Sequence, residues 1–385
     1  MTYDFLIVGA GLTGSVLAEQ IAGRLGKKVL IIDRRDHIGG NTFDRVDEHG
    51  VRIHQYGPHL FHTNSAKVWK YLSRFTDWHF YEHRVLAEIN GLRVPVPFNL
   101  TSLHALFPAH HADRIESLLK GVFGVGSQVP IFTLQERVKE LAGRLSDQDF
   151  ADLSEVANFI YENVFYGYTI KQWGLTPQEL GPSVLGRVPI RISHDDRYFQ
   201  DRYQALPAEG YEPLVASILS NPDIHVETGV DFKDAKGAIS FNKLIYTGPI
   251  DAYFDYCYGE LPYRSLMFEF EHYNTAFFQE RTQINYPNQH AYTRITEFKH
   301  ATGQDIPTTT IAREYPRKHI PGENEPYYPI PLETNHRLFR KYAARAGQLD
   351  SVVFAGRLAD YKYYNMDQAV ARALSVFEKK IATLR

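Results

Sequence analysis

Three glycines near the start of the chain have the spacing of a turn that binds a nucleotide phosphate. Gly9, Gly11 and Gly14 follow the apolar run 5–8 in the order G-x-G-x-x-G. Gly9 permits a tight turn, Gly11 lets backbone approach a pyrophosphate, and Gly14 lets a helix pack closely on the strand. The first turn of that helix offers unpaired N–H groups to the anion. The pattern therefore predicts a dinucleotide site.

The elements around these glycines form a complete strand–helix–strand unit. Apolar residues recur at helical spacing from Ala18 to Leu25, and a second apolar run, 29–32, ends in Asp33. Asp33 follows Gly14 by nineteen residues, where a carboxylate can accept a hydrogen bond from a ribose 2′-hydroxyl. This acid favours NAD or FAD over NADP. The alternative, a glycine turn without a ligand, is disfavoured because the whole unit is present.

The residues after Asp33 favour FAD over NAD. Arg34 begins a basic pair, and a second glycine pair at 39–40 precedes Asn41. A NAD domain usually enters another helix here, whereas a glycine loop can lay backbone against a second part of a longer cofactor. The stretch resembles the R-x-x-x-G-G-N extension of glutathione-reductase-like FAD proteins. The later glycine run 121–126 has the wrong spacing and follows a helix, so we expect a loop and no separate NAD(P)H domain.

A second loop, predicted over residues 42–64, contains three histidines. His54, His59 and His62 could suggest a metal, but no carboxylate or thiolate lies beside them at ligand spacing, and Gly57-Pro58 interrupts any helix. We therefore expect no metal and interpret the segment as a loop against the flavin ring. Purely structural histidines remain the alternative for His59 and His62.

Composition limits the function classes. The chain has 385 residues, a net charge of −3 and a single cysteine, Cys257. These values give no sign of nucleic-acid binding and exclude an intrachain disulfide. No apolar run has the length of a membrane span, and the first strand leaves no room for a signal peptide, so we expect a cytoplasmic enzyme. Its 25 tyrosines and 24 phenylalanines suggest an amphipathic ligand cleft as well as core.

The rest of the chain divides by pattern. Residues 84–98 alternate around Asn90-Gly91, a hairpin signal, and Pro95 and Pro97 place the second strand at a sheet edge. Residues from about 100 to 186 have helical spacing, and residues 261–316 alternate as in an antiparallel sheet. A last strand before Gly356-Arg357 precedes a helix at 367–377, whose N-terminus could receive negative charge from a reduced flavin.

These segments predict an α/β protein with three parts. The first is a discontinuous Rossmann-like FAD-binding domain of residues 1–80, 207–260 and 346–385. The second is a helical insert domain of residues 99–186, and the third is an antiparallel β-sheet domain of residues 81–98, 187–206 and 261–345. Arg187 and Arg294 lie in aromatic contexts, and two such guanidinium groups from different segments could hold one diphosphate.

Together these motifs resemble the bacterial UDP-galactopyranose mutases over nearly the whole chain. Besides the glycine fingerprint, the matching segments are 38–41, 56–64, 96–99, 167–174, 202–204, 245–251, 325–329 and 356–364. Two residues depart from the family pattern: Pro58 stands where Ala is common, and Asn365 where Asp is common.

The resemblance implies isomerisation of UDP-galactopyranose to UDP-galactofuranose without net redox change, with FAD in the reduced state. N5 of the reduced flavin would form a covalent adduct at the anomeric carbon. It also implies a role in supplying galactofuranose for glycans, and a homodimer formed through the helical insert. Two other classes stay open: an amine-oxidase-type FAD oxidoreductase, which substrate would reduce, and a non-catalytic sugar-nucleotide-binding protein.

The resemblance also assigns residues. Arg187, Arg294 and His62 are the expected catalytic side chains, and Arg187 lies on a mobile lid with hinges at Gly181, Pro182 and Gly186. The expected substrate-binding residues are Tyr168, Thr169, Trp173, Arg187, Tyr198, Asn285, Arg294, Tyr328, Tyr363 and Asn365. The expected cofactor-binding residues are Gly9, Gly11, Leu12, Thr13, Gly14, Asp33, Arg34, Gly40, Asn41, His59, Leu60, Arg357, Tyr363, Asn365 and Met366.

Overall fold

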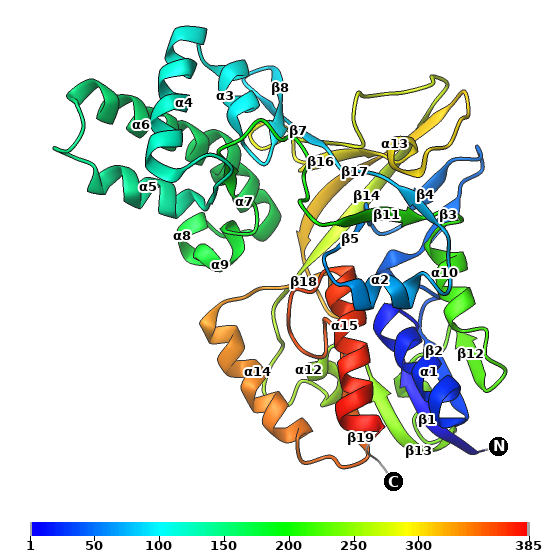
Figure 1. The fold of residues 1–385 in the computed structure, drawn as a ribbon. Coiled ribbons are helices and arrows are strands. Elements are labelled where there is room, and N and C mark those ends of the chain that lie inside the picture. The colour runs from blue at the N-terminus through cyan, green and yellow to red at the C-terminus, as the bar shows by residue number, and fades with distance from the viewer. Residues whose placement is uncertain (1, 383–385) are drawn as a thin grey trace.

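A five-stranded parallel sheet occupies one end of the molecule in the computed structural model, which describes residues 2–382 (Figure 1). Its strand order is β12-β2-β1-β13-β19, and every neighbouring pair is parallel. The strands are β1 (Thr2–Val8), β2 (Val29–Asp33), β12 (Ile224–Thr228), β13 (Ser240–Tyr246) and β19 (Val352–Phe354). The predicted Rossmann-like sheet is confirmed, and its strands come from three distant parts of the chain.

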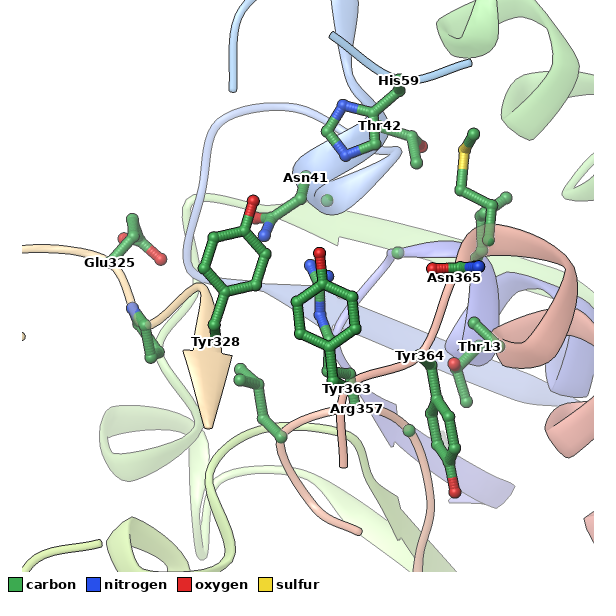
Figure 2. A pocket seen from close by; sticks show the side chains of 18 of the residues that line it. Thr13, Asn41, Thr42, His59, Glu325, Tyr328, Arg357, Tyr363, Tyr364 and Asn365 are labelled. Atoms are coloured by element: carbon green, nitrogen blue, oxygen red, sulfur yellow. The ribbon is translucent and has the colours of Figure 1, made fainter. Parts of the chain in front are cut away.

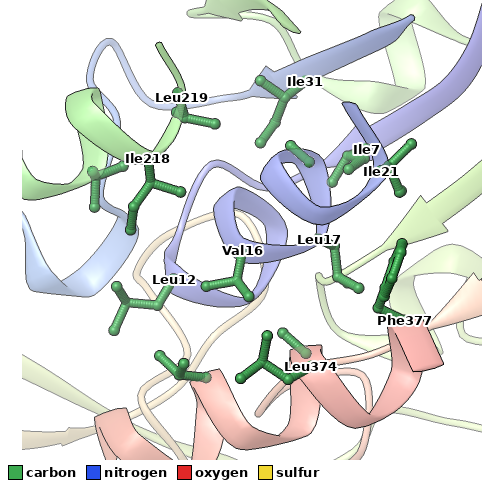
Figure 3. Packing of buried hydrophobic residues seen from close by; sticks show 14 of the residues in the cluster. Ile7, Leu12, Val16, Leu17, Ile21, Ile31, Ile218, Leu219, Leu374 and Phe377 are labelled. Atoms are coloured by element: carbon green, nitrogen blue, oxygen red, sulfur yellow. The ribbon is translucent and has the colours of Figure 1, made fainter. Parts of the chain in front are cut away.

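Helices α1 (Leu12–Leu25), α10 (Tyr211–Ile218) and α15 (Met366–Val376) cover one face of this sheet (Figure 1). Val16 and Leu17 on α1 are fully buried, and Figure 3 shows them between the sheet and Leu374 of α15. Because each apolar side chain buried here contributes about 1.5–3 kcal/mol, this cluster holds the N- and C-terminal segments together. The glycine turn is thereby fixed on a rigid support.

The helical insert lies at the opposite end of the molecule (Figure 1). Its main helices are α3 (Leu100–Leu106), α4 (Ala109–Phe123), α5 (Ile131–Glu140), α6 (Asp147–Ile160) and α7 (Gly167–Trp173), with short helices α8 (Pro177–Leu180) and α9 (Pro182–Leu185). Their buried apolar residues form a cluster of their own. Capping side chains mark the helix starts, as at Asn99 and Ser146, whose oxygens accept backbone N–H groups. A π-helical stretch, Tyr161–Tyr166, joins α6 to α7.

A seven-stranded sheet lies between these two ends, with the order β18-β14-β17-β16-β15-β7-β8. Its strands are β7 (Val85–Ile89), β8 (Leu92–Val96), β14 (Tyr263–Tyr273), β15 (Gln283–Asn285), β16 (Arg294–Glu297), β17 (Thr309–Lys318) and β18 (Tyr328–Pro329). The predicted hairpin turns at Asn90 and Gly91, both at positive φ, and β8 is the predicted edge strand. All pairs are antiparallel except β15 with β7, which the alternation pattern did not reveal.

Two segments differ from the sequence expectations. Residues 42–64, predicted as a loop, contain the short strands β3 (Asp44–Val46), β4 (Arg52–His54) and β5 (Phe61–Thr63). Strand β5 joins β11 (Tyr203–Pro207) and β6 (Trp78–Phe80) in a three-stranded sheet. Such three-residue strands are too short to show an alternation in the sequence. Helix α14 (Glu333–Ala346) was also not predicted; its buried Tyr342 packs beside Phe254 and Tyr258.

Short helices complete the fold. They are α2 (Ala66–Leu72), α11 (Phe232–Ala235), α12 (Ile250–Tyr253) and α13 (Lys299–Thr302). Strands β9 (Gln128–Val129) and β10 (Ile190–Arg191) pair with each other and tie the helical insert to the segment that follows it. Within residues 2–382, no helix combines the length and the apolar character needed to cross a bilayer.

Candidate active site

A cavity of about 1470 Å³ lies where the three parts of the molecule meet. Its lining includes Gly9 from the parallel sheet, Trp173 from the helical insert and Arg294 from the seven-stranded sheet. Pockets for one small ligand typically measure roughly 300–1,000 Å³. The volume is therefore sufficient for a dinucleotide together with a second ligand.

The glycine fingerprint forms one wall of the cavity. Gly9 has a φ of +104°, and a Cβ there would lie 2.1 Å from Oγ1 of Thr247. A Cβ on Gly14 would lie 1.9 Å from the carbonyl oxygen of Gly9. Oδ2 of Asp33 accepts a 2.8 Å hydrogen bond from the backbone N–H of Ala10. The turn therefore requires glycine at both positions, and Asp33 stabilises it while lining the cavity.

The second glycine loop touches the first. A Cβ on Gly40 would lie 2.9 Å from Cα of Gly11, so the two loops approach more closely than side chains would allow. Arg34 lines the cavity, but its Nη2 also pairs with Glu325 at 2.6 Å. Asn41 accepts a 2.8 Å hydrogen bond from Nη2 of Arg35. The extended glycine loop thus presents backbone, as expected for a cofactor longer than a single nucleotide.

The C-terminal segment closes this end of the cavity. Gly356 has a φ of +107° and lies beside Thr13, and Asn365 caps helix α15 through a capping box. Figure 2 shows Thr13, Asn365 and Arg357 around the same space. Every predicted cofactor-binding residue lines this cavity, namely Gly9, Gly11, Leu12, Thr13, Gly14, Asp33, Arg34, Gly40, Asn41, His59, Leu60, Arg357, Tyr363, Asn365 and Met366. The residues present fit FAD.

Arg187 reaches the cavity from the segment that directly follows the helical insert. Its guanidinium lies over the ring of Tyr363, 3.9 Å from the centroid, and its Nη2 donates to Oδ1 of Asn365 at 3.0 Å. This segment and the C-terminal segment thus meet across the cavity through three residues that sequence analysis assigned to the substrate.

Arg294 enters from the sheet and is paired with Glu314 on the neighbouring strand. Burial alone would lower the pKa of Arg294, but the Glu314 carboxylate and the nearby Tyr168 and Tyr328 raise that pKa well above its ordinary value. The guanidinium is therefore a permanent cation. Its two hydrogen bonds to Glu314 use Nε and Nη2, which leaves Nη1 for an anionic ligand.

Three aromatic rings that line the cavity form a cluster. Tyr328 and Tyr363 stack with centroids 5.0 Å apart, and Trp173 lies 6.1 Å and 6.4 Å from them (Figure 2 shows the two tyrosines). Burial raises the pKa of Tyr168, Tyr198 and Tyr328, so these phenols stay neutral hydrogen-bonding groups. Neutral hydroxyls and flat faces suit a sugar and a base.

Two predicted substrate-binding residues are not in the cavity lining. Thr169 is buried on the other side of α7, because successive helical residues point about 100° apart and Tyr168 faces the cavity. Oδ1 of Asn285 accepts a 2.8 Å hydrogen bond from Nε2 of Gln283, and Gln283 is the residue that lines the cavity. Thr169 and Asn285 therefore do not line the cavity in this structure, and their contacts with the substrate stay predictions.

The histidines of the 51–64 segment have separate partners. Nδ1 of His59 lies 2.8 Å from the carbonyl oxygen of Gly57, and Nδ1 of His54 accepts from the backbone N–H of His59. Burial lowers the pKa of both His54 and His59 to about 3, so both are neutral. His62 pairs with Asp201, a residue that sequence analysis did not single out. Within residues 2–382, the only cluster of potential metal ligands is His111, Asp152 and Glu155, away from this segment.

Fold and cavity together define an enzyme with a Rossmann-like dinucleotide-binding domain. Comparison with known proteins makes this class specific. A model of the UDP-galactopyranose mutase family matches residues 163–363, and a model of NAD(P)-binding Rossmann-like domains matches residues 7–75. The chain belongs to the UDP-galactopyranose mutase family, a family of isomerases.

Curated relatives agree along the full length. The chain is 35% identical to a probable UDP-galactopyranose mutase of Klebsiella pneumoniae, over 99% of this chain and 95% of the relative. It is 35% identical to the UDP-galactopyranose mutase of Mycoplasma genitalium, over 96% and 92%. It is also 32% identical to a dTDP-fucopyranose mutase of Escherichia coli, over 96% of each chain.

Solved structures share the fold. A crystal structure of reduced UDP-galactopyranose mutase superposes with a TM-score of 0.74 at 15% identity, covering 99% of this chain and 94% of the other. Putrescine oxidase bound to putrescine gives a TM-score of 0.54 at 13% identity, covering 99% of each chain. At these identities the likeness extends to the fold alone.

Proposed function

We propose that this chain interconverts UDP-galactopyranose and UDP-galactofuranose with reduced FAD held at the glycine-lined end of the cavity. One observation carries the proposal. Arg187 and Arg294, from two segments far apart in the chain, line the cavity that continues from the dinucleotide cradle. Two guanidinium groups suit a diphosphate, and the rings of Trp173 and Tyr363 suit the attached nucleoside and sugar.

The two arginines bind the diphosphate and compensate its charge as it leaves the sugar. Reduced FAD, held by the glycine turn and the C-terminal segment, would supply a nucleophilic N5 for the chemistry at the anomeric carbon. Holding UDP close after it leaves lets it return to the same carbon, which is a proximity effect of the protein. In this proposal, Asn365 and the phenol of Tyr328 orient the sugar hydroxyls.

The segment that carries Arg187 acts as a lid. It follows the short helices α8 and α9, between which Gly181 has a φ of +73°. Arg187 meets Tyr363 and Asn365 across the cavity, so closure brings a cation to the diphosphate and removes water at the same time. We infer that His62 transfers a proton during the isomerisation.

The first test is anaerobic incubation of the purified yellow protein with UDP-galactofuranose, with and without dithionite, followed by chromatography of the sugar nucleotides. Conversion to UDP-galactopyranose only with dithionite supports the proposal. If a small molecule instead bleaches the flavin without dithionite and no sugar nucleotide is converted, the protein is an oxidoreductase of the amine-oxidase type.

The relative named as a dTDP-fucopyranose mutase gives a second candidate substrate. The same incubation should therefore include dTDP-fucofuranose in parallel. A higher kcat/KM for UDP-galactofuranose supports the proposed substrate, and the reverse order assigns the chain to the deoxysugar reaction. Light scattering of the same preparation tests the expected homodimer.

A further inference from the structure

His62 and Asp201 form a hydrogen-bonded pair in the wall of the cavity. Nδ1 of His62 lies 2.9 Å from Oδ2 of Asp201, and both residues line the cavity. The side chain of His62 is 15% exposed and that of Asp201 is 23% exposed. The pair brings together strand β5 and the segment that precedes β11, which are 139 residues apart in the chain.

The other oxygen of Asp201 is also fixed. Oδ1 accepts a 2.9 Å hydrogen bond from Nδ2 of Asn64, and Oδ1 of Asn64 accepts from the backbone N–H of Arg202 at 2.9 Å. Asn64 therefore holds the carboxylate and the following backbone in one arrangement. A carboxylate fixed in this way has a defined direction toward the imidazole.

The plane of the imidazole is fixed as well. Its ring stacks on Phe199 with centroids 3.6 Å apart and an angle of 12° between the planes. Phe199 also contacts the rings of His83 and Tyr198. Burial lowers the pKa of His83 to about 3 and raises the pKa of Tyr198, so both rings are uncharged, and the carboxylate of Asp201 is the partner that faces His62.

These contacts determine which nitrogen of His62 carries the proton. A carboxylate accepts hydrogen bonds, so the nitrogen facing Asp201 is the N–H, and neutral His62 has its lone pair on Nε2. Among residues 2–382, no protein group is hydrogen-bonded to this Nε2. His62 can therefore accept a proton from a ligand in the cavity, and Asp201 stabilises the imidazolium that results.

The proposed reaction needs such a group. Converting the six-membered ring to the five-membered ring removes a proton from the sugar 4-hydroxyl, which enters the ring, and adds one to the ring oxygen, which becomes the 5-hydroxyl. We propose that Asp201 is the positioning residue that holds His62 in the Nδ1–H form, so that Nε2 moves this proton between the two sugar oxygens. The inference rests on the proposed function and adds Asp201 to it.

A double-mutant cycle tests the role of Asp201. We expect His62→Gln to lower kcat by about 10²- to 10⁴-fold, and Asp201→Ala to lower it by about tenfold or more, with KM changed less than about threefold. In the His62→Gln background, Asp201→Ala should add less than about threefold, because its effect passes through the missing imidazole. If the fold-losses in kcat of the two single variants multiply in the double variant, the two residues act independently and the proposal is overturned. Asp305→Ala, at an exposed aspartate, is the matched control.

The tautomer gives a readout that does not depend on turnover. In the holoenzyme labelled with ¹⁵N-imidazole histidine, two-bond ¹H–¹⁵N spectra distinguish the two neutral forms, and His62→Gln identifies the signal of His62. We expect the Nδ1–H form in the wild type and its loss in Asp201→Ala. An Nε2–H form in the wild type would refute the positioning role. If the wild type converts neither sugar nucleotide, the isomerase proposal fails. The spectra still decide whether Asp201 fixes the tautomer of His62, because they do not depend on turnover.

Discussion

Arg294 donates from Nε and Nη2 to the same oxygen of Glu314, at 2.8 Å and 2.6 Å, from the directly opposite position on the neighbouring strand. The side chain of Glu314 is only 1% exposed. A carboxylate buried this deeply needs its partner, because breaking a buried ion pair leaves an uncompensated charge. Arg294, which is proposed to bind the diphosphate, is thus also needed for the stability of the fold.

Arg294→Ala and Arg294→Lys should therefore differ. We expect Arg294→Ala to lower the free energy of unfolding by about 3–5 kcal/mol, because it strands the Glu314 carboxylate. Arg294→Lys keeps the charge but loses the forked donors, so it should remain folded and lose turnover by about 10²- to 10³-fold. Urea unfolding and steady-state kinetics measure the two effects. Loss of bound flavin from the folded lysine variant would contradict the diphosphate role.

Arg187→Ala should lower turnover while leaving the free energy of unfolding nearly unchanged. Arg187 is exposed, so its removal should change the free energy of unfolding by less than about 0.5 kcal/mol. Turnover should fall by about 10²-fold or more, with a normal spectrum of the bound flavin. Arg144→Ala, at an exposed arginine of the helical insert, should leave both quantities unchanged. Equal kinetic losses in the two variants would argue against a specific contact with the diphosphate.

Two glycines of helix α1 provide a matched pair. A Cβ at Gly14 would lie 1.9 Å from the carbonyl oxygen of Gly9, so Gly14→Ala must displace the phosphate-binding turn. We expect Gly14→Ala to lower the free energy of unfolding by about 1–3 kcal/mol. The variant should also lose its bound FAD on gel filtration. At Gly23 the nearest atom is 3.6 Å away, and Gly23→Ala should stabilise the helix by up to about 1 kcal/mol. Retention of FAD by Gly14→Ala would contradict the close approach.

Glu297 should make stability depend on pH. It is fully buried, and burial alone would raise its pKa, but hydrogen bonds from His300, Thr309 and the backbone N–H groups of Phe278 and Gln279 lower that pKa below the ordinary value of 4.5. The unfolded chain therefore binds this proton more readily. The stabilisation is present above about pH 4.5 and is lost as the pH falls through the lower native pKa.

Glu297→Gln should accordingly cost about 2–3 kcal/mol at pH 7, measured by urea unfolding, because the amide cannot accept from all these donors. The difference from the wild type should narrow below pH 4.5. Glu48→Gln, at a side chain that is 87% exposed, is the control and should have no such effect. A difference that stays constant from pH 7 to pH 3.5 would show that the charge of Glu297 does not contribute.

Local patterns predicted the parts of the site that are contiguous in sequence. Gly9, Gly14 and Asp33 share one strand–helix–strand unit, so their spacing alone indicated the dinucleotide cradle. Glu314 and Asp201 were missed because each gains its role from a contact that folding creates. Glu314 pairs with Arg294, and Asp201 pairs with His62. No spacing in the sequence gives the strand register that joins them.

Features that depend on the assembled fold were not visible in the sequence for similar reasons. Thr169 lies one residue from Tyr168, yet the helix turns it away from the cavity, and only the orientation of α7 decides which of the two faces the ligand. The parallel pairing of β15 with β7 is likewise a property of the assembled sheet. For Asn365, the sequence showed the departure from the family pattern. Only the structure shows its contact with Arg187.

Because neighbouring strands of the parallel sheet are far apart in the chain, the sheet cannot form early during synthesis on the ribosome. Thr2 of β1 pairs with Ser240, so one edge of β1 stays unpaired until 238 further residues have been synthesised. At about 5–20 residues per second, that interval lasts roughly 10–50 s. Throughout it, the nascent chain exposes the unpaired backbone edge of the apolar strand β1, which β13 later covers. Chaperones that shield hydrophobic segments during translation should therefore affect the yield of this protein more than that of one built from consecutive strands.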